Sequence, residues 1–182
     1  MKDNNNNKTT RVMIPERVGI DKRCLGANNR TRFGHWEKDA VVSCKGSKGS
    51  LAVAQERKSR FIVVQKTNTM SPKEHAEATK KMTEGLFVLS YTYDNGIENK
   101  YHKLLGTPSF FCDAYASWQK GGVENGNKMI RRYLPKKTNL SEISQDYIDH
   151  IVSIINNKPR KILGYKTALE VAMAGGVLLK DK

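Results

Sequence analysis

The fold is decided by one stretch, residues 36–65, which reads WEKDAVVSCKGSKGSLAVAQERKSRFIVVQ. Three short apolar runs lie in it, at residues 36–44, 51–55 and 61–65, and they are rich in the Val and Ile that favour strands. A Gly/Ser run separates the first two, and a short polar link separates the last two. Short apolar runs joined by tight links predict an antiparallel meander of three strands.

Outward from this stretch, the chain alternates helices and strands. Ser71 and Pro72 mark a helix start, and Glu74 is expected to complete a capping box with Ser71. A second capping box, from Thr167 to Glu170, predicts a short last helix. The other predicted elements are a strand over residues 86–93, a short helix over 97–105, a strand over 108–112, and helices over 123–133 and 145–158. This order predicts an α/β protein with a mixed sheet and helices packed on it.

The length of 182 residues allows one domain with a hydrophobic core. Residues 1–31 are polar and basic and show no sustained period, so they are expected to form a flexible tail or linker. The core is expected over residues 32–175, and residues 176–182 are expected to be a short C-terminal tail.

Several classes of protein are excluded by composition. The sequence has no apolar run of about 18 residues, the length that a membrane-spanning helix needs. The first residues have no apolar stretch, which excludes a secretory signal. The three cysteines lie far apart, which excludes a disulfide framework and a CxxC metal site. A reduced, intracellular protein is the simplest interpretation.

The charge points to an acidic partner. The chain has 32 Lys and Arg against 18 Asp and Glu, a formal net charge of +14. Nucleic acid is the commonest partner of such a protein, although a solvated basic surface is the alternative. One basic cluster lies in residues 1–35. The other surrounds the single acid Glu124 and consists of Lys120, Lys128, Arg131, Arg132, Lys136 and Lys137.

Three acids stand at places suited to chemistry. Asp39 lies inside the first predicted strand, Asp94 follows a later strand directly before a Gly turn, and Glu124 lies near the start of a predicted helix. Carboxylates from two strands and a helix can converge on hard cations such as magnesium. Two such ions can serve phosphoryl transfer. Taken alone, each acid could equally be an exposed strand residue, a β-turn residue or a salt-bridged helix residue.

Six ordered sequence words are more specific. They are HWEKD at residues 35–39, ERKSR at 56–60, YDNGIE at 93–98, SWQKGGVEN at 117–125, RRYLPK at 131–136 and NKPRKILGY at 157–165. Together they resemble the catalytic domain of the IS-thirty family of bacterial insertion-sequence transposases, over roughly residues 14–171. These are DDE transposases of the retroviral-integrase superfamily. The resemblance implies an RNase H-like mixed five-stranded sheet flanked by helices.

The resemblance also implies a site and a reaction. Asp39, Asp94 and Glu124 match the acidic triad, as catalytic residues and as ligands of two magnesium ions, which manganese can replace. The implied reaction is hydrolysis of the phosphodiester at transposon ends, followed by attack of the freed 3′-hydroxyl on target DNA. The implied partners are double-stranded DNA and further copies of the chain, at least a dimer. No membrane and no small-molecule cofactor is expected, and the implied place is the nucleoid of a prokaryotic cytoplasm.

Neighbouring residues receive roles from the same comparison. The six cations around Glu124 are expected to contact DNA phosphates, which gives affinity but not sequence choice. Trp118 could stack on a base or pack beneath the helix, and packing is favoured. His102 and Glu98 could stand behind the metal ligands, although a surface histidine and an ordinary turn acid are the alternatives.

The sequence departs from the family pattern in three places. Lys38 stands where the family commonly has Gly, and strand alternation is expected to point it away from Asp39. The interval from Asp94 to Glu124 is shorter than usual, around residues 99–108, and Ala114 replaces the usual Pro.

Helix-turn-helix segments normally precede the catalytic domain in this family, and about thirty polar residues cannot hold them. A truncated or split transposase is therefore expected. One alternative is an inactive remnant that only binds DNA or a full-length partner. Another is a basic RNA- or ribosome-binding protein, for which the three acids would be exposed and scattered.

Overall fold

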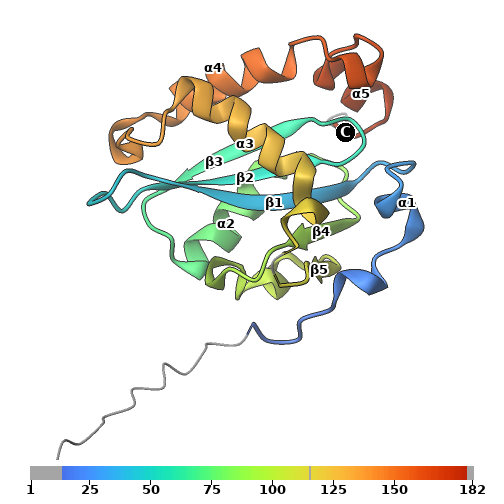
Figure 1. The fold of residues 1–182 in the computed structure, drawn as a ribbon, viewed down its shortest axis with the longest axis horizontal. Helices are drawn as coiled ribbons and strands as arrows, with labels where there is room; N and C mark the ends of the chain where they lie inside the picture. Colours follow the sequence, from blue (N-terminus) through green and yellow to red (C-terminus); the bar gives the residue numbers. More distant parts are fainter. Residues whose placement is uncertain (1–13, 115, 180–182) are drawn as a thin grey trace, which may run out of the picture.

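The computed structural model describes residues 14–114 and 116–179, which form a five-stranded sheet in the order β3-β2-β1-β4-β5 (Figure 1). The strands are β1 His35–Val42, β2 Ser50–Glu56, β3 Ile62–Thr67, β4 Ser90–Tyr93 and β5 Ser109–Phe111. β1, β2 and β3 pair antiparallel, whereas β4 and β5 run parallel to β1. The predicted meander and the predicted mixed sheet are confirmed.

Two strands are shorter than predicted. β4 begins at Ser90 rather than at residue 86, because the chain before it bonds outside the sheet ladder. The N–H groups of Phe87 and Leu89 donate to the carbonyls of Val177 and Gly34. β5 likewise covers three residues within the predicted 108–112.

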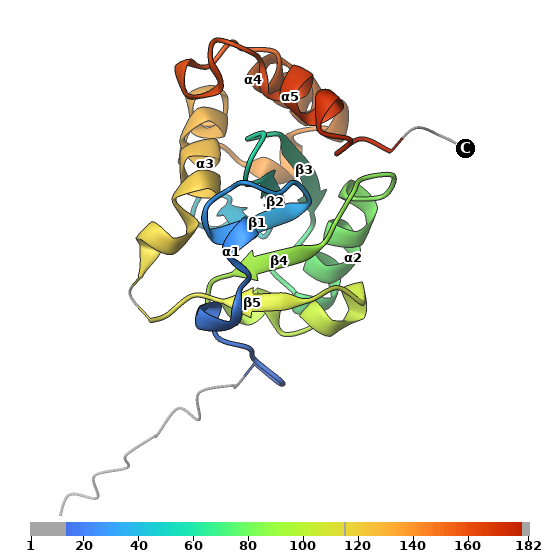
Figure 2. The ribbon, with the colours of Figure 1, turned by 90° about the vertical axis from the view of Figure 1, so that its right-hand side faces the viewer.

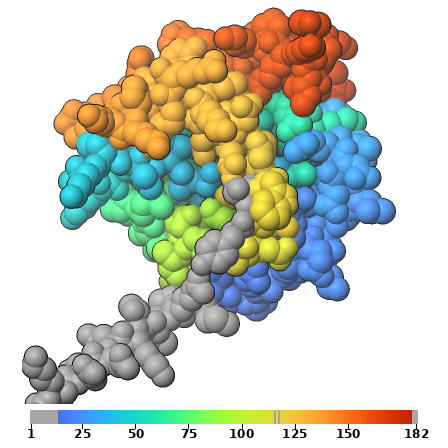
Figure 3. All heavy atoms as spheres, in the orientation of Figure 1, coloured from blue at the N-terminus to red at the C-terminus, as the bar shows by residue number. Residues whose placement is uncertain are grey.

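Helices cover both faces of the sheet and one of its edges. They are α1 Leu25–Asn28, α2 Pro72–Met82, α3 Gly121–Tyr133, α4 Gln145–Asn156 and α5 Ala168–Ala174. Short 3-10 helices join them: η1 Ile20–Lys22, η2 Ile97–Asn99, η3 His102–Leu105, η4 Ser117–Lys120, η5 Leu140–Glu142 and η6 Lys161–Leu163. α2 and α3 lie on opposite faces, with α4 and α5 beyond β3 (Figure 2). α3 runs across the front surface in Figure 3. The short helix predicted over residues 97–105 is two 3-10 helices.

The helix caps agree with the prediction except at one residue. The Ser71 side chain accepts from Glu74 N and the Thr167 side chain from Glu170 N, each the third residue of its helix, and the Thr167–Glu170 capping box is complete. Glu74, however, does not complete a box with Ser71. Its carboxylate accepts from the backbone N–H groups of Asn68 and Thr69 and so ties the end of β3 to α2.

Two apolar clusters hold the layers together. The first joins β1, β2 and β3 to α3 and α4, and Leu51, Ile130 and Ile151 lie at its centre. The second joins β4 and β5 to α5 around Trp36 and Phe111, both fully buried. The apolar stripe of α4 at Ile148, Ile151 and Ile155 faces the sheet as its helical spacing predicts.

The expected tails belong largely to the domain. Residues 14–31 carry η1 and α1, and both Ile20 and Ala27 are buried. The Val18 carbonyl accepts from Phe111 of β5, so this segment covers the edge of the sheet. At the other end Val177 is fully buried, so the prediction of a C-terminal tail is wrong for residues 176–179. Residues 1–13 and 180–182 lie outside the described part of the chain. Backbone hydrogen bonds attach residues 14–31 to the sheet. The sequence does not reveal these bonds, because they require no periodic pattern of apolar residues.

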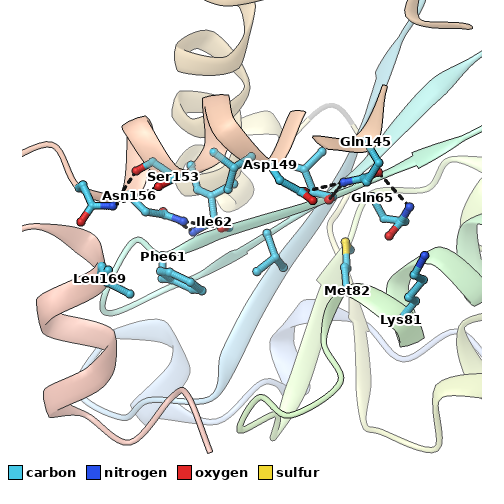
Figure 4. A pocket seen from close by; sticks show the side chains of 14 residues that line it. Phe61, Ile62, Gln65, Lys81, Met82, Gln145, Asp149, Ser153, Asn156 and Leu169 are labelled. Atoms are coloured by element: carbon cyan, nitrogen blue, oxygen red, sulfur yellow. Dashed lines mark hydrogen bonds between the residues drawn. The ribbon is translucent and has the colours of Figure 1, made fainter. Parts of the chain in front are cut away.

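The edge of β3 is covered by two amide side chains of α4. Asn156 Oδ1 accepts from Ile62 N at 2.9 Å, and Asn156 Nδ2 donates to Ile62 O at 2.8 Å. Gln145 likewise accepts from Lys66 N at 2.8 Å and donates to Val64 O at 3.1 Å. A groove of about 460 Å³ remains between β3, α4 and the end of α2 (Figure 4). None of the three predicted catalytic acids lines it.

A chain of buried polar groups lies under β1. Lys38 Nζ donates to His75 Nδ1 at 3.2 Å, and His75 Nε2 lies 3.0 Å from Ser50 Oγ. Because an ammonium can only donate, Nδ1 accepts and the ring proton is on Nε2. Lys38 thus points to the α2 face, away from Asp39, as strand alternation predicts.

This chain of groups predicts a loss of stability in acid. Burial, helped by the Lys38 charge, lowers the pKa of His75 from 6.5 to about 4. As pH falls from 6.5 towards 4, the unfolded chain takes up a proton that the folded one refuses, so stability falls. The full window corresponds to roughly 3 kcal/mol. Urea unfolding at both ends of the window should show this loss, and His75→Gln should reduce it. The matched change at exposed His150 should leave it unaltered, and an equal pH dependence of both variants would contradict the prediction.

Candidate active site

Asp39 and Asp94 come together at one edge of the sheet. Asp39 lies in β1, Asp94 directly follows β4, and these two strands are parallel neighbours. Parallel strands bring their carboxyl ends to the same edge. Lys120 Nζ lies 3.2 Å from Asp39 Oδ1 and 3.0 Å from Asp94 Oδ2. The two carboxylates therefore face a single cation, and both remain partly open to solvent, with Asp39 20% and Asp94 41% exposed.

Lys120 is a buried member of this site. Its ammonium also donates to the Lys38 carbonyl, and the residue is 4% exposed. Burial acts to lower the pKa of Lys120, but the charges of Asp39 and Asp94 outweigh it and raise the pKa above its ordinary value. In the same way, burial acts to raise the pKa of Asp94, and Lys120 brings it below its ordinary value. Contrary to the prediction, this side chain does not stand free for a DNA phosphate.

Glu124 lies on the helix face that looks at Asp39. Asn127 Nδ2 donates to Asp39 Oδ2 at 2.7 Å, so Lys120 and Asn127 both contact this aspartate. Glu124 lies three residues before Asn127 in α3, which places these two residues on the same face of the helix, and Lys120 directly precedes the helix at the end of η4. It is half-buried and makes no ion pair with a described residue. Among the described residues, no three His, Cys, Asp or Glu side chains are gathered as a metal site. The structure thus brings Asp39 and Asp94 to one cation, and it does not bring Glu124 into contact with either aspartate among the described residues.

The side-chain amide of Asn99 bonds to the Asp94 carboxylate. Asn99 Nδ2 donates to Asp94 Oδ1 at 2.9 Å, and Asn99 Oδ1 accepts from Lys38 Nζ at 3.1 Å. Glu98 lies beside them, where burial and the Asp94 charge raise its pKa. Burial lowers the pKa of Lys38 to about 8. The site therefore has Asp39 and Asp94 partly open to solvent and Glu98 beside Asp94. The ammonium groups of Lys120 and Lys38 balance the charge of these acids.

Comparisons with known proteins agree with this arrangement. The chain is 34% identical over 180 residues to the transposase InsI for insertion sequence element IS30A of Escherichia coli, covering 93% of this chain and 45% of that protein. It is 36% identical over 168 residues to the transposase for insertion sequence element IS1086 of Cupriavidus metallidurans, covering 88% of this chain and 49% of that one.

The chain is thus similar to about half of the length of insertion-sequence transposases, IS30A among them. A third relative, the transposase for insertion sequence element IS4351 of Bacteroides fragilis, is 34% identical over 169 residues. The match covers 88% of this chain and 51% of that relative, so the chain spans about half the length of the relatives it matches. No protein-family model matches the chain.

The fold comparison points the same way. A chain in a structure of the simian T-cell lymphotropic virus intasome, solved in complex with PP2A regulatory subunit B56 gamma, superposes with a TM-score of 0.61. The match covers 83% of this chain and 56% of that one at 15% identity, so it shows the fold alone. It confirms the RNase H-like, integrase-type sheet that the IS-thirty resemblance implies. No helix in the described part of the chain is long and apolar enough to cross a bilayer.

The other predicted site residues divide into two groups. Lys128, Arg132, Lys136 and Lys137 are exposed on or beyond α3, as DNA contacts require. Arg131 instead donates to the carbonyls of Val42, Leu134 and Pro135, so it braces the end of α3.

Trp118 is placed differently from the favoured expectation, and His102 fits neither of its two alternatives. Trp118 is 75% exposed, so packing beneath the helix is wrong and the ring is free to stack. His102 is buried, with Nε2 3.0 Å from the Pro15 carbonyl and its ring edge-on to Phe111. It contacts none of the three acids through the hydrogen bonds and ion pairs of the described residues, whereas Glu98 does lie beside Asp94.

Three functional positions escaped the sequence interpretation. Asn127 could have been found from its spacing to Glu124, because residues three apart share a helix face. Asn99 could not, because a 3-10 turn rather than a periodic helix places it. Glu37 is the third: its Oε2 accepts from Val123 N at 2.8 Å and so seats the start of α3 against β1.

Proposed function

We propose that the chain is the catalytic part of a DDE transposase, which cleaves phosphodiesters at transposon ends and joins them to target DNA with magnesium. The observation that carries the proposal is the meeting of Asp39 and Asp94 at one cation. The names of the relatives support the reaction class. Such a protein would act as an oligomer, at least a dimer, on double-stranded DNA in a prokaryotic cytoplasm.

The donor set fits a hard cation. Asp39 and Asp94 offer carboxylate oxygens, which magnesium prefers. Asn127 Oδ1 is buried beside Asp39 without a hydrogen-bond partner in the described residues, so one more oxygen is available there. Asp39 and Asp94 would hold the first ion, and Glu124 would complete the set for two. When bound, magnesium activates the attacking water or 3′-hydroxyl and stabilises the leaving oxygen.

The protein residues have their own tasks in this proposal. Lys120 keeps the two aspartates charged and offsets their mutual repulsion, and its ammonium would have to move aside for an ion to bind there. Asn99 and Asn127 fix the orientation of the two carboxylates through the bonds described above. No protein nucleophile is required, because the attacking group is water or a DNA hydroxyl.

DNA would lie across the start and outer face of α3. The exposed cations Lys128, Arg132, Lys136 and Lys137 would contact backbone phosphates, and such contacts make affinity dependent on salt. Trp118, exposed two residues before Lys120, would stack on a base near the cleaved phosphate.

Soaking crystals of the chain with manganese tests the proposal. We expect anomalous density within ligand distance of the Asp39 and Asp94 carboxylates, with Lys120 Nζ moved away from both. Crystals of Asp94→Asn should lose this density, whereas crystals of Asp113→Asn, a matched change at an exposed acid after β5, should keep it. Manganese absent from the two aspartates, or bound equally in the Asp94→Asn crystals, would contradict the assignment.

A further inference from the structure

Two arginines beside the start of α3 have no partner for their charge. Arg30 follows α1, and Arg60 lies in the turn between β2 and β3. Neither guanidinium makes a hydrogen bond or an ion pair with any described residue. Arg30 Nε is moreover buried without a partner. Both residues are half-buried, so the two groups are held in place rather than free in solvent.

The nearby acids are already engaged. Glu37 accepts from the Arg57 guanidinium and from Val123 N. Glu56 accepts from the backbone N–H groups of Gly34, Lys58 and Ser59 and from the Ser59 hydroxyl. Glu37 and Glu56 therefore act on Arg60 only through space, and no described carboxylate forms an ion pair with Arg30 or Arg60.

The neighbouring arginines, by contrast, are used in the fold. Arg57 also donates to the Ala27 and Asn28 carbonyls, and Arg23 donates to the Asn28 and Thr92 side chains. Burial and the charges of Arg30 and Arg57 lower the pKa of Arg60 and outweigh the opposing effect of Glu37 and Glu56. Arg23 and Arg57 thus have structural bonds, whereas Arg30 and Arg60 repel each other and are bonded to no described residue.

The backbone holds the two free arginines in unusual conformations. Arg30 has a φ of 55° and Arg60 a φ of 65°, the left-handed region that residues with a side chain rarely adopt. Such strain persists where the surrounding structure imposes it, and it is common at ligand-binding positions. Here the result is that two turns from different parts of the chain present their arginines to one place.

That place borders the acidic site. A Cβ atom at Gly122 would lie 3.2 Å from Arg60 Nη1, so the guanidinium rests on the first turn of α3. Lys120, two residues earlier, contacts both aspartates. In Figure 3 the start of α3 (yellow), the β2–β3 turn (teal) and the segment around α1 (blue) meet on one face.

We propose that Arg30 and Arg60 form a clamp for a DNA backbone phosphate, adjacent to the phosphodiester that reaches the acids. The guanidinium fork matches the geometry of phosphate oxygens, and a phosphate would supply the anion that the pair lacks. The clamp would fix the direction in which the strand leaves the site. This inference rests on the proposed function, since it takes DNA as the substrate.

Binding of a short fluorescent DNA duplex of arbitrary sequence, measured by anisotropy with EDTA present, tests the clamp without the metal. For the Arg30→Gln/Arg60→Gln variant, the plot of log affinity against log salt should be shallower by about 0.9 for each lost contact. At about 0.1 M salt this corresponds to roughly eightfold weaker binding per arginine.

The matched control is Lys45→Gln/Lys48→Gln, which removes the same charge in the β1–β2 turn, at the opposite end of β2. We expect it to bind nearly as the wild type does. A double-arginine variant with unaltered affinity and slope, or a control that loses as much, would overturn the clamp. Failure of the wild type itself to bind the duplex would instead count against the proposed function.

If thermal unfolding shows that the Arg30→Gln/Arg60→Gln variant does not fold, binding is measured with the Arg30→Lys/Arg60→Lys variant instead. It keeps both charges but not the forked donors. We expect the salt dependence of the wild type together with weaker binding. Wild-type affinity in this variant would overturn a clamp that depends on the guanidinium fork.

Discussion

Replacing Asp94 by Asn should lower metal-dependent strand cleavage by about 10³-fold or more. An amide carries no charge to hold a magnesium ion, and the ion is what would activate the attacking oxygen. Asp39→Asn should have the same effect, because the two aspartates face the same cation. The measurement is nicking of a labelled duplex that carries the terminal sequence of a related insertion element, with magnesium or with EDTA.

Two variants sharpen this result. Asp113→Asn changes an exposed acid that is bonded to Gln119, and it should nick as the wild type does. Glu124→Gln tests the helix stripe: a loss as large as that of Asp94→Asn is expected if Glu124 joins the two aspartates when metal binds. Equal nicking by the wild type and Asp94→Asn would refute the catalytic assignment. Manganese binding without nicking by the wild type would favour the inactive chain considered as the alternative.

The second large effect concerns the ion pair under α3. Arg57→Met should destabilise the fold by about 3–5 kcal/mol, because it leaves the Glu37 carboxylate charged, 1% exposed and without its cation. The variant also loses the Arg57 bonds to the Ala27 and Asn28 carbonyls, which fasten α1 to the sheet. Urea unfolding at neutral pH measures the loss.

An exposed pair provides the comparison. Lys22 lies 3.3 Å from Asp21, and their side chains are 74% and 69% exposed. Lys22→Met should therefore cost at most about 1 kcal/mol. The double variant Glu37→Gln/Arg57→Met should regain part of the loss, because it buries no unpaired charge. An Arg57→Met variant as stable as Lys22→Met would show that Glu37 does not depend on its partner.

The sequence predicts those parts of the fold that local chemistry specifies. Turn residues delimit the three-stranded meander, and caps such as Thr167 place the helices within a few residues of their observed ends. The convergence of Asp39 and Asp94 also follows, because parallel neighbouring strands share an edge. These features depend on the period of apolar residues or on residues a few positions apart.

The remaining features depend on contacts between distant residues, which no local pattern encodes. Lys120 is predicted as a surface cation, but two carboxylates from other elements draw it inside. Residues 14–31 are predicted as a tail because they show no periodic apolar pattern. Hydrogen bonds that such a pattern does not encode, such as that from Phe111 N to Val18 O, hold them on the domain. The size of the Trp118 side chain predicts burial, but the side chain is exposed two residues before Lys120.

The cover over the outer strands has a consequence for assembly. The amides of Gln145 and Asn156 occupy one border of the sheet, and the backbone around Val18 occupies the other. A second copy therefore cannot join by adding its own strand to either border. If copies gather on DNA, helix surfaces, loops or the nucleic acid itself must connect them.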